Sequence, residues 1–308
     1  MFLLWERPNV TEEASEGCDC EVGTWFGRSS VCGDHEANSA PGPEAARPAP
    51  CGAAARPTLR PVIVQISDFH IGGETSIVDP ERRLTATVAA VQALPQRPDG
   101  ILISGDLADD GSDASYERVL DLLSPLESPI HVIVGNHDDR ERLARHFGVS
   151  RVQGYVQYVA DIGPIHLIAL DSQIPGSDAG SLDGGRLDWL EQQLAAVPER
   201  PTIVALHHPP FSIGIDEADA IGLDGDDTNE LARIIARHRQ VQRVICGHVH
   251  CVVTGDLAGR VTITAPSTYV ELDPDFDAEE LEVRAGQPGF LIHRLAGDRI
   301  VTYSETVH

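Results

Sequence analysis

The sequence has little positive charge and no long apolar run. It carries 23 Lys and Arg residues against 48 Asp and Glu residues, a formal net charge of -25 over 308 residues. Because so acidic a surface repels polyanions, we expect neither nucleic acid nor an anionic membrane as a partner. A small anionic substrate can bind only where cations reverse the field locally. No apolar run reaches the roughly 18 residues of a membrane-spanning helix, and the short apolar start lacks the basic flank of a signal peptide, so a cytoplasmic protein is expected.

The first 58 residues lack hydrophobic periodicity, and residues 40–57 are rich in Pro, Ala and Gly. Such a composition cannot bury enough apolar area to order itself. We therefore predict a disordered extension at residues 1–58 and one folded domain at residues 59–308.

Cysteine is also scarce, with 6 in the chain. Cys18, Cys20 and Cys32 could form a small zinc site with His35, but their spacing does not match a C-x2-C pair. We interpret these cysteines as reduced thiols. A chain of this length with so few cysteines implies no disulfide framework.

Beyond residue 59, apolar β-branched runs alternate with amphipathic segments. The first three runs are Val62–Ile66, Ile101–Ile103 and Ile130–Val134. Asp79 before Pro80 is a typical helix start, and a second helix is expected over Ser112–Leu123. Because β-rich segments finish the chain after residue 250, the pattern predicts an α/β fold with a mixed sheet.

Five of the predicted strands end in a polar cluster. The clusters are Asp68 with His70, Asp106, Asn136 with His137, His207 with His208, and His248 with His250. In open α/β sheets ligands bind beyond the carboxyl ends of the strands, so we expect these side chains to converge. Each cluster alone is weak evidence, because an ordinary polar turn or a packed loop also explains it. All five together, each after an apolar run, indicate a site.

Together the clusters offer two carboxylates, one amide and several imidazoles. These are too many donors for one tetrahedral zinc ion, and they suit two metal ions with mixed oxygen and nitrogen ligands. A bridging carboxylate holds two divalent cations roughly 3.5–4 Å apart, and Asp106 is the best candidate for it. Imidazole ligands favour two divalent metal ions of the Fe, Mn or Zn type over Mg, and the native pair stays open.

The motifs D-x-H, G-D, G-N-H-D, H-H-P and G-H-x-H occur in this order along the chain. As a set they resemble the calcineurin-like metallophosphoesterase superfamily. Ile66–His70, Gly105–Asp109 and Gly247–His250 are similar to its bacterial class III cyclic-nucleotide phosphodiesterase branch. The resemblance covers about residues 60–270. It implies a four-layer αββα sandwich of two mixed β-sheets flanked by helices.

The resemblance also implies a role for each position. One metal ion would be held by Asp68, His70, Asp106 and His250, and the other by Asp106, Asn136, His207 and His248. His207 fits the pattern better than His208 because it lies two residues before Pro209. His137 would face the substrate phosphate beside Asn136 and act as the general acid. Either Asp138 or Asp171 could orient His137, and the sequence does not choose between them.

These residues predict a dinuclear-metal phosphodiesterase that hydrolyses 3′,5′-cyclic nucleotides or other small phosphodiesters by attack of a metal-bridging hydroxide. Two divalent ions carry four positive charges, and Asp68, Asp106 and a hydroxide offset three of them. The remaining charge matches a phosphodiester monoanion better than a phosphomonoester dianion. The alternatives are a phosphomonoesterase or protein phosphatase, a nucleotide pyrophosphatase, or a binding protein without catalysis. A homodimer stays open.

Residues 211–227 are rich in Gly and Asp and show no clear period. We predict that they form a long loop beside the site. This loop is the candidate element for substrate selectivity, and a solvated connection is the alternative.

Overall fold

The computed structural model describes residues 60–73, 77–274, 276 and 281–308. The predicted extension at residues 1–58 lies outside the described residues, so its disorder stays a prediction. Among the described residues, no helix combines the length and apolarity that crossing a membrane requires.

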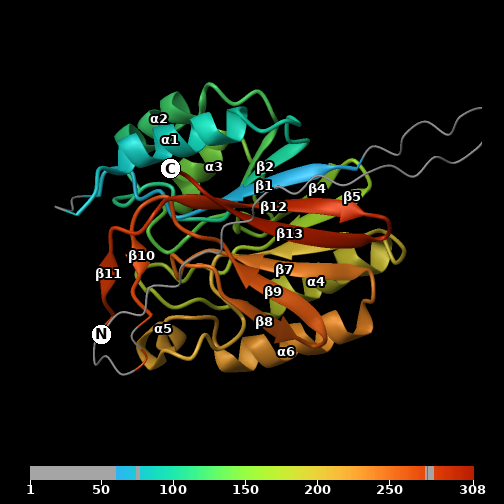
Figure 1. The fold of residues 1–308 in the computed structure, drawn as a ribbon. Coiled ribbons are helices and arrows are strands. Elements are labelled where there is room, and N and C mark those ends of the chain that lie inside the picture. The colour runs from blue at the N-terminus through green and yellow to red at the C-terminus, as the bar shows by residue number, and fades with distance from the viewer. Residues whose placement is uncertain (1–59, 74–76, 275, 277–280) are drawn as a thin grey trace, which may run out of the picture. The chain divides into compact units, whose positions relative to one another are not determined.

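Two mixed β-sheets organise the described chain (Figure 1). The first has the order β13-β12-β1-β2-β3. Strands β1, β2 and β3 run parallel, β12 is antiparallel to β1, and β13 is antiparallel to β12. The second has the order β4-β5-β6-β7-β9-β8, with β5, β6, β7 and β9 parallel and an antiparallel strand at each edge. The bounds of the first sheet are β1 (Val62–Ile66), β2 (Gly100–Ile103), β3 (Ile130–Val132), β12 (Gly289–Ala296) and β13 (Arg299–Thr306). Those of the second are β4 (Tyr158–Ile162), β5 (Ile165–Ala169), β6 (Thr202–Ala205), β7 (Val241–Cys246), β8 (Thr254–Leu257) and β9 (Arg260–Thr264).

Helices cover the outer face of each sheet (Figure 1). On the first sheet these are α1 (Pro80–Gln92), α2 (Asp113–Leu123) and α3 (Arg140–Phe147), and on the second α4 (Gly184–Ala196) and α6 (Gly225–Arg237). The predicted helix starts are confirmed, because Asp79 accepts a hydrogen bond from the Arg82 N–H and Ser112 caps α2 in the same way.

Three apolar layers separate the four layers of secondary structure. Val64 of β1 packs toward α1–α3, whereas its neighbour Ile63 packs against the second sheet. On the second sheet, Ile203 joins the layer between the sheets and Val204 packs toward α4 and α6. Strands buried on both faces explain the continuous apolar runs of the sequence. The predicted four-layer αββα sandwich is confirmed.

The prediction of one long loop at residues 211–227 is wrong in part. The segment contains a short helix, α5 (Asp216–Ala220), and α6 already begins at Gly225, capped by Asp224. A small sheet of β10 (Glu271–Leu272) and β11 (Val283–Arg284) was not predicted either. Two-residue strands carry too little periodicity to be recognised from sequence.

Candidate metal centre

The predicted ligands lie in loops that leave the carboxyl ends of the strands, and their backbones are unusual. Asp68, His70, Asp106, His248 and His250 have φ angles of 55°, 49°, 52°, 74° and 55°. Non-glycine residues rarely adopt this left-handed conformation, which costs about 1–3 kcal/mol per residue. Among the described residues only two other non-glycine residues do so. Strain concentrated on these five residues indicates a functional site.

The first predicted ligand set comes together in the structure. Nε2 of His70 lies 3.1 Å from Nε2 of His250 and 3.6 Å from Oδ2 of Asp106. Nε2 of His250 lies 3.7 Å from Oδ1 of Asp68. One ligand atom from each of the four residues lies within 4.8 Å of the others. Two ring nitrogens that face each other beside two carboxylates form a donor set that fits a cation.

The second predicted set adjoins the first through Asp106. Oδ2 of Asp106 lies 3.3 Å from Nε2 of His207, and the same atom faces His70 of the first set. Oδ1 of Asn136 lies 3.0 Å from Nε2 of His207 and 3.1 Å from Nδ1 of His248. The position of this carboxylate between the two sets is the one required of a bridging ligand.

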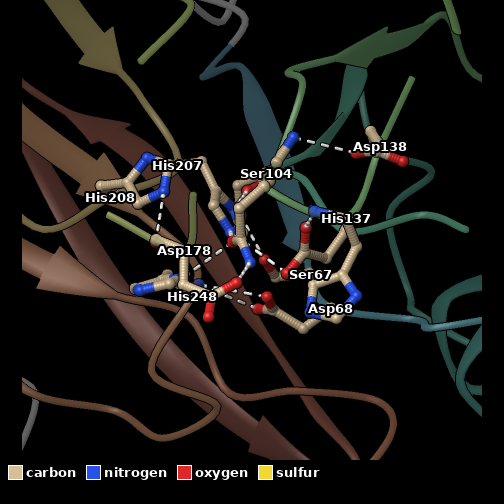
Figure 2. A network of polar contacts seen from close by, with 12 residues as sticks. Ser67, Asp68, Ser104, His137, Asp138, Asp178, His207, His208 and His248 are labelled. Carbon is tan, nitrogen blue, oxygen red and sulfur yellow. Dashed lines mark hydrogen bonds and ion pairs between the residues drawn. The ribbon is translucent and has the colours of Figure 1, made fainter. Parts of the chain in front are cut away.

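His208 lies close to the second set but has other partners. Its ring nitrogen lies within 4.8 Å of those of His207 and His248. Nδ1 of His208 already contacts the hydroxyl of Ser172 at 2.8 Å, and Nε2 contacts the carbonyl of Asp178 at 3.1 Å (Figure 2). The geometry therefore favours His207 over His208 as a ligand.

Outer hydrogen bonds fix the orientation of the predicted ligands. The Nδ1–H of His207 donates a hydrogen bond to the carbonyl of Ser104 at 2.7 Å. The lone pair of Nε2 therefore stays available to coordinate a metal ion. The backbone N–H of His248 donates to both carboxylate oxygens of Asp68, at 3.1 and 3.3 Å (Figure 2). Such second partners set the tautomer and direction of metal-binding side chains.

Burial dominates the electrostatics of the cluster. It lowers the pKa of His248 and of His250 to about 3, so both rings are neutral at pH 7 and offer lone pairs. It also raises the pKa of Asp68. Burial acts on Asp106 in the same direction, but attraction to His207 outweighs it and holds the pKa of Asp106 well below its usual range. Buried carboxylates need cationic partners, and the neutral rings of His248 and His250 offer lone pairs, so the residues present fit two metal ions.

Sequence reasoning missed Asp109 as the partner of His137. Nδ1 of His137 lies 3.3 Å from Oδ1 of Asp109, and this hydrogen-bonded contact raises the pKa of His137 to about 9. The two predicted partners lie elsewhere: Asp138 accepts hydrogen bonds from Tyr116 and backbone N–H groups, and Asp171 pairs with Arg140. Both predictions for the orienting residue are wrong. The available signal was the second carboxylate of the Gly105–Asp109 motif.

Two glycines are required by close approach, and Gly105 also has a φ of 105°, which residues with a side chain rarely adopt. A Cβ at Gly135 would overlap the carboxylate of Asp106, and one at Gly105 would overlap the ring of His207. The packing of the candidate ligands therefore requires the glycine of the Gly-Asn-His-Asp motif and that of the Gly-Asp motif.

A family model described as calcineurin-like phosphoesterase matches residues 61–252 of this chain. The chain belongs to the calcineurin-like phosphoesterase family. Calcineurin-like phosphoesterases use a dinuclear divalent metal centre, and both predicted ligand sets lie within the matched residues.

Curated relatives of this calcineurin-like phosphoesterase are named phosphodiesterases. A probable cyclic nucleotide phosphodiesterase of Synechococcus sp. is 40% identical over 68% of this chain and 82% of its own length. A probable glycerophosphodiester phosphodiesterase of Arcobacter nitrofigilis is 34% identical over 71% of this chain and 83% of its own length. A cAMP/cGMP dual specificity phosphodiesterase of Mycobacterium tuberculosis is 31% identical over 81% of this chain and 80% of its own length. This calcineurin-like phosphoesterase is thus a metal-dependent phosphoric ester hydrolase.

Solved structures support the fold. A dimetal phosphatase from Danio rerio superposes with a TM-score of 0.63 at 16% identity, over 80% of this chain and 96% of that one. The likeness extends the assignment of the calcineurin-like phosphoesterase fold beyond the matched residues.

Proposed function

We propose that this chain is a dinuclear-metal phosphodiesterase that acts on 3′,5′-cyclic nucleotides or other small phosphodiesters. The observation that carries the proposal is the position of Asp106 Oδ2, 3.6 Å from Nε2 of His70 and 3.3 Å from Nε2 of His207. One carboxylate thereby joins two donor sets, and His137 lies beside them.

In this proposal Asp68, His70, Asp106 and His250 hold one divalent ion, and Asp106, Asn136, His207 and His248 hold the other. The nitrogen-rich set favours an Fe, Mn or Zn-type pair over Mg. When bound, two such ions activate a water molecule as nucleophile and stabilise charge on the phosphate oxygens. The chain contributes rigidity, because the strained loops and outer hydrogen bonds hold the ligand atoms before any ion arrives.

His137 supplies the proton that an alkoxide leaving group needs. Its Nδ1 faces the side chain and the carbonyl of Asp109, at 3.3 and 3.2 Å. Nε2 is therefore the ring nitrogen that is left for the substrate. The backbone N–H of His137 donates to Oδ1 of Asp106 at 3.0 Å. This hydrogen bond holds His137 directly against the bridging carboxylate. The side chain is partly exposed, so a leaving oxygen can reach it.

Charge at the rim supports a preference for diesters. The exposed carboxylate of Asp178 lies 3.4 Å from the Asn136 amide nitrogen. A phosphomonoester near pH 7 carries close to two negative charges, whereas a phosphodiester carries one. The monoester therefore meets about twice the repulsion from Asp178.

A cavity of about 730 Å³ begins at His250 and offers room for the alcohol part of a substrate. Its lining includes the apolar side chains of Ile213, Ile215 and Leu272 together with Arg284. Ile213 and Ile215 belong to the 211–227 segment, which supports a role of that segment in selectivity. The wall also carries polar side chains, among them Glu271, Gln287 and Ser304. Apolar surface for a base together with polar groups for a ribose suits a nucleoside better than a glycerol group.

The deciding experiment compares bis(p-nitrophenyl) phosphate with p-nitrophenyl phosphate on metal-stripped protein with Mn²⁺ added back, and uses Asn136→Ala as control. Metal-dependent turnover that favours the diester supports the proposal. The natural substrate class then follows from kcat/KM on 3′,5′-cAMP, 2′,3′-cAMP and glycerophosphocholine. A preference for the monoester would move the function to a phosphatase. No turnover with any metal would leave a binding protein.

A further inference from the structure

A second cavity, of about 550 Å³, is lined by arginine. Arg239, Arg243, Arg260 and Arg299 all contribute to its wall, and Glu199 and Asp298 are the acidic residues there. Four guanidinium groups against two carboxylates leave an excess of two positive charges. On a chain with a formal net charge of -25, such an excess at one place is unusual.

These arginines are not used in ion pairs. In the part of the chain that the structure describes, none of the four has a carboxylate oxygen within 4.0 Å, although Glu199 and Asp298 line the same cavity. Arginines elsewhere do pair, as Arg237 does with Glu191 at 2.8 Å and Arg200 with Asp161 at 2.9 Å. The cavity therefore keeps unpaired positive charge on a protein that is rich in carboxylates.

Two of the four guanidinium groups also keep a buried donor without a partner. The Nε–H groups of Arg243 and Arg260 are buried and donate to no acceptor among the described residues. The other groups of Arg243 are held rigidly, because they donate to the carbonyls of Gln242 and Ile300 at 2.9 and 2.5 Å. Arg260 donates only to the carbonyl of Gly259, at 3.3 Å. The Nε atoms of Arg186 and Arg294, outside the cavity, are equally unpartnered, so it is the unpaired charge of the lining that argues for an anion.

The cavity lies at the opposite end of the sheets from the metal centre. Arg243 lies near the start of β7, whereas His248 and His250 follow the end of that strand. Arg260 is the first residue of β9, directly after the turn from β8, and Arg299 is the first residue of β13, directly after the turn from β12. Figure 1 shows both turns at the same end of the two sheets. Gln242 joins the two sides, since its amide donates to the carbonyl of Asp298 and accepts from the N–H of Ile300.

We propose that this cavity is a second anion site, separate from the metal centre, that binds the dianionic phosphate of inorganic phosphate or of a small phosphomonoester. Arginine forks match phosphate oxygens in a bidentate manner. A phosphate near pH 7 carries about two negative charges, which equals the excess charge of the lining. Long polyanions are excluded because the rest of the surface is acidic. The site does not depend on the proposed phosphodiesterase activity.

The test is calorimetric titration of the full chain after removal of metal with a chelator, at pH 7.5 and constant ionic strength. The ligands are inorganic phosphate, AMP and glycerol 3-phosphate, with dimethyl phosphate as a monoanion. We expect one equivalent of each of the first three to bind and dimethyl phosphate to bind at least about tenfold more weakly. Equal affinities identify free phosphate as the source, whereas tighter AMP or glycerol 3-phosphate identifies a phosphomonoester.

Substitutions test whether phosphate binds in this cavity. Arg260→Ser and Arg299→Ser each remove one charged donor at a turn and are expected to weaken phosphate about tenfold or more. Arg233→Ser on α6 makes the same change in net charge at a residue paired with Glu230 and should leave the affinity within about twofold. His137→Ala should also bind phosphate as the wild type does. Absence of binding, an equal loss in Arg233→Ser, or a loss in His137→Ala alone would each overturn the proposal.

Discussion

The Asp109 carboxylate accepts a hydrogen bond from Nδ1 of His70 at 2.8 Å. The same oxygen lies 3.3 Å from Nδ1 of His137. One side chain therefore orients a candidate metal ligand and the candidate general acid together. These contacts with His137 and His70 hold the pKa of Asp109 well below its ordinary value, so it is ionised throughout the neutral range.

Asp109→Asn is expected to weaken both functions while it keeps the shape of the side chain. The amide oxygen can still accept from both rings, but it carries no negative charge, so both hydrogen bonds are weaker. We expect metal affinity or kcat on alkyl diesters to fall about 10- to 100-fold. Metal content per chain and a separation of kcat from KM distinguish the two effects. Wild-type values for both would remove Asp109 from its positioning role.

His137→Ala should affect substrates according to their leaving group. An alkoxide needs a proton, so turnover of ribose or alkyl esters is expected to fall about 10²–10⁴-fold. p-Nitrophenolate leaves without protonation, so its esters should lose far less. The ratio of kcat values on 3′,5′-cAMP and bis(p-nitrophenyl) phosphate measures the difference. Equal losses on both substrates contradict a general-acid role.

Gly135→Ala should damage the metal centre without touching a side-chain ligand. The added Cβ would overlap both the carboxylate and the backbone nitrogen of Asp106, so the whole residue must shift away from one donor set. We expect metal affinity to fall at least about tenfold. Gly184→Ala is the matched control, since a Cβ at Gly184 meets nothing within 4 Å. Full metal loading of Gly135→Ala would show that Asp106 does not need its present position.

The part of the site that could be predicted from sequence consists of residues that belong to local sequence motifs. Asp68, Asp106 and His250 each follow an apolar strand. The parallel pairing of β1 with β2 brings Asp68 and Asp106 together, and His250 joins them from β7 of the facing sheet. The partner of His137 could not be assigned, because Asp138 is adjacent to it in sequence whereas Asp109 lies 28 residues away and reaches it only in the fold. The arginine cavity could not be predicted at all. It depends on two hairpin turns, more than thirty residues apart, that meet at one end of the sheets.

Asp178→Asn should shift the preference between monoesters and diesters. In water, one negative charge about 6 Å from a phosphate weakens binding roughly threefold for each negative charge on the phosphate. Removal of that charge restores the same factor. The ratio of kcat/KM for p-nitrophenyl phosphate over bis(p-nitrophenyl) phosphate should therefore rise about threefold at low salt. The gain should shrink as ionic strength increases. A ratio that does not change at low salt would remove Asp178 from selectivity.

His293 should make the folded state sensitive to acid. Its ring is fully buried on β12, where Nε2 contacts Oε1 of Gln65 and Nδ1 contacts the hydroxyl of Thr302, both at 2.9 Å. The Gln65 amide donates to Ser104 and to the Cys246 carbonyl, so its oxygen must accept from the ring. A neutral imidazole satisfies both contacts, and burial lowers the pKa of His293 to about 3.

In the unfolded chain the pKa of this histidine is about 6.5. Between that value and about 3 the unfolded state binds the extra proton, so stability is lost as the pH falls through this window. Between pH 7.5 and pH 5.5 the loss from this one residue is about 1.4 kcal/mol. The contribution of His293 is isolated by urea unfolding of the metal-free wild type and of His293→Gln at both pH values. The variant should be less stable at pH 7.5 yet lose about 1.4 kcal/mol less on acidification, because the other buried histidines contribute equally to both proteins. An identical pH dependence in the two proteins would mean that the pKa of His293 is not lowered in the folded state.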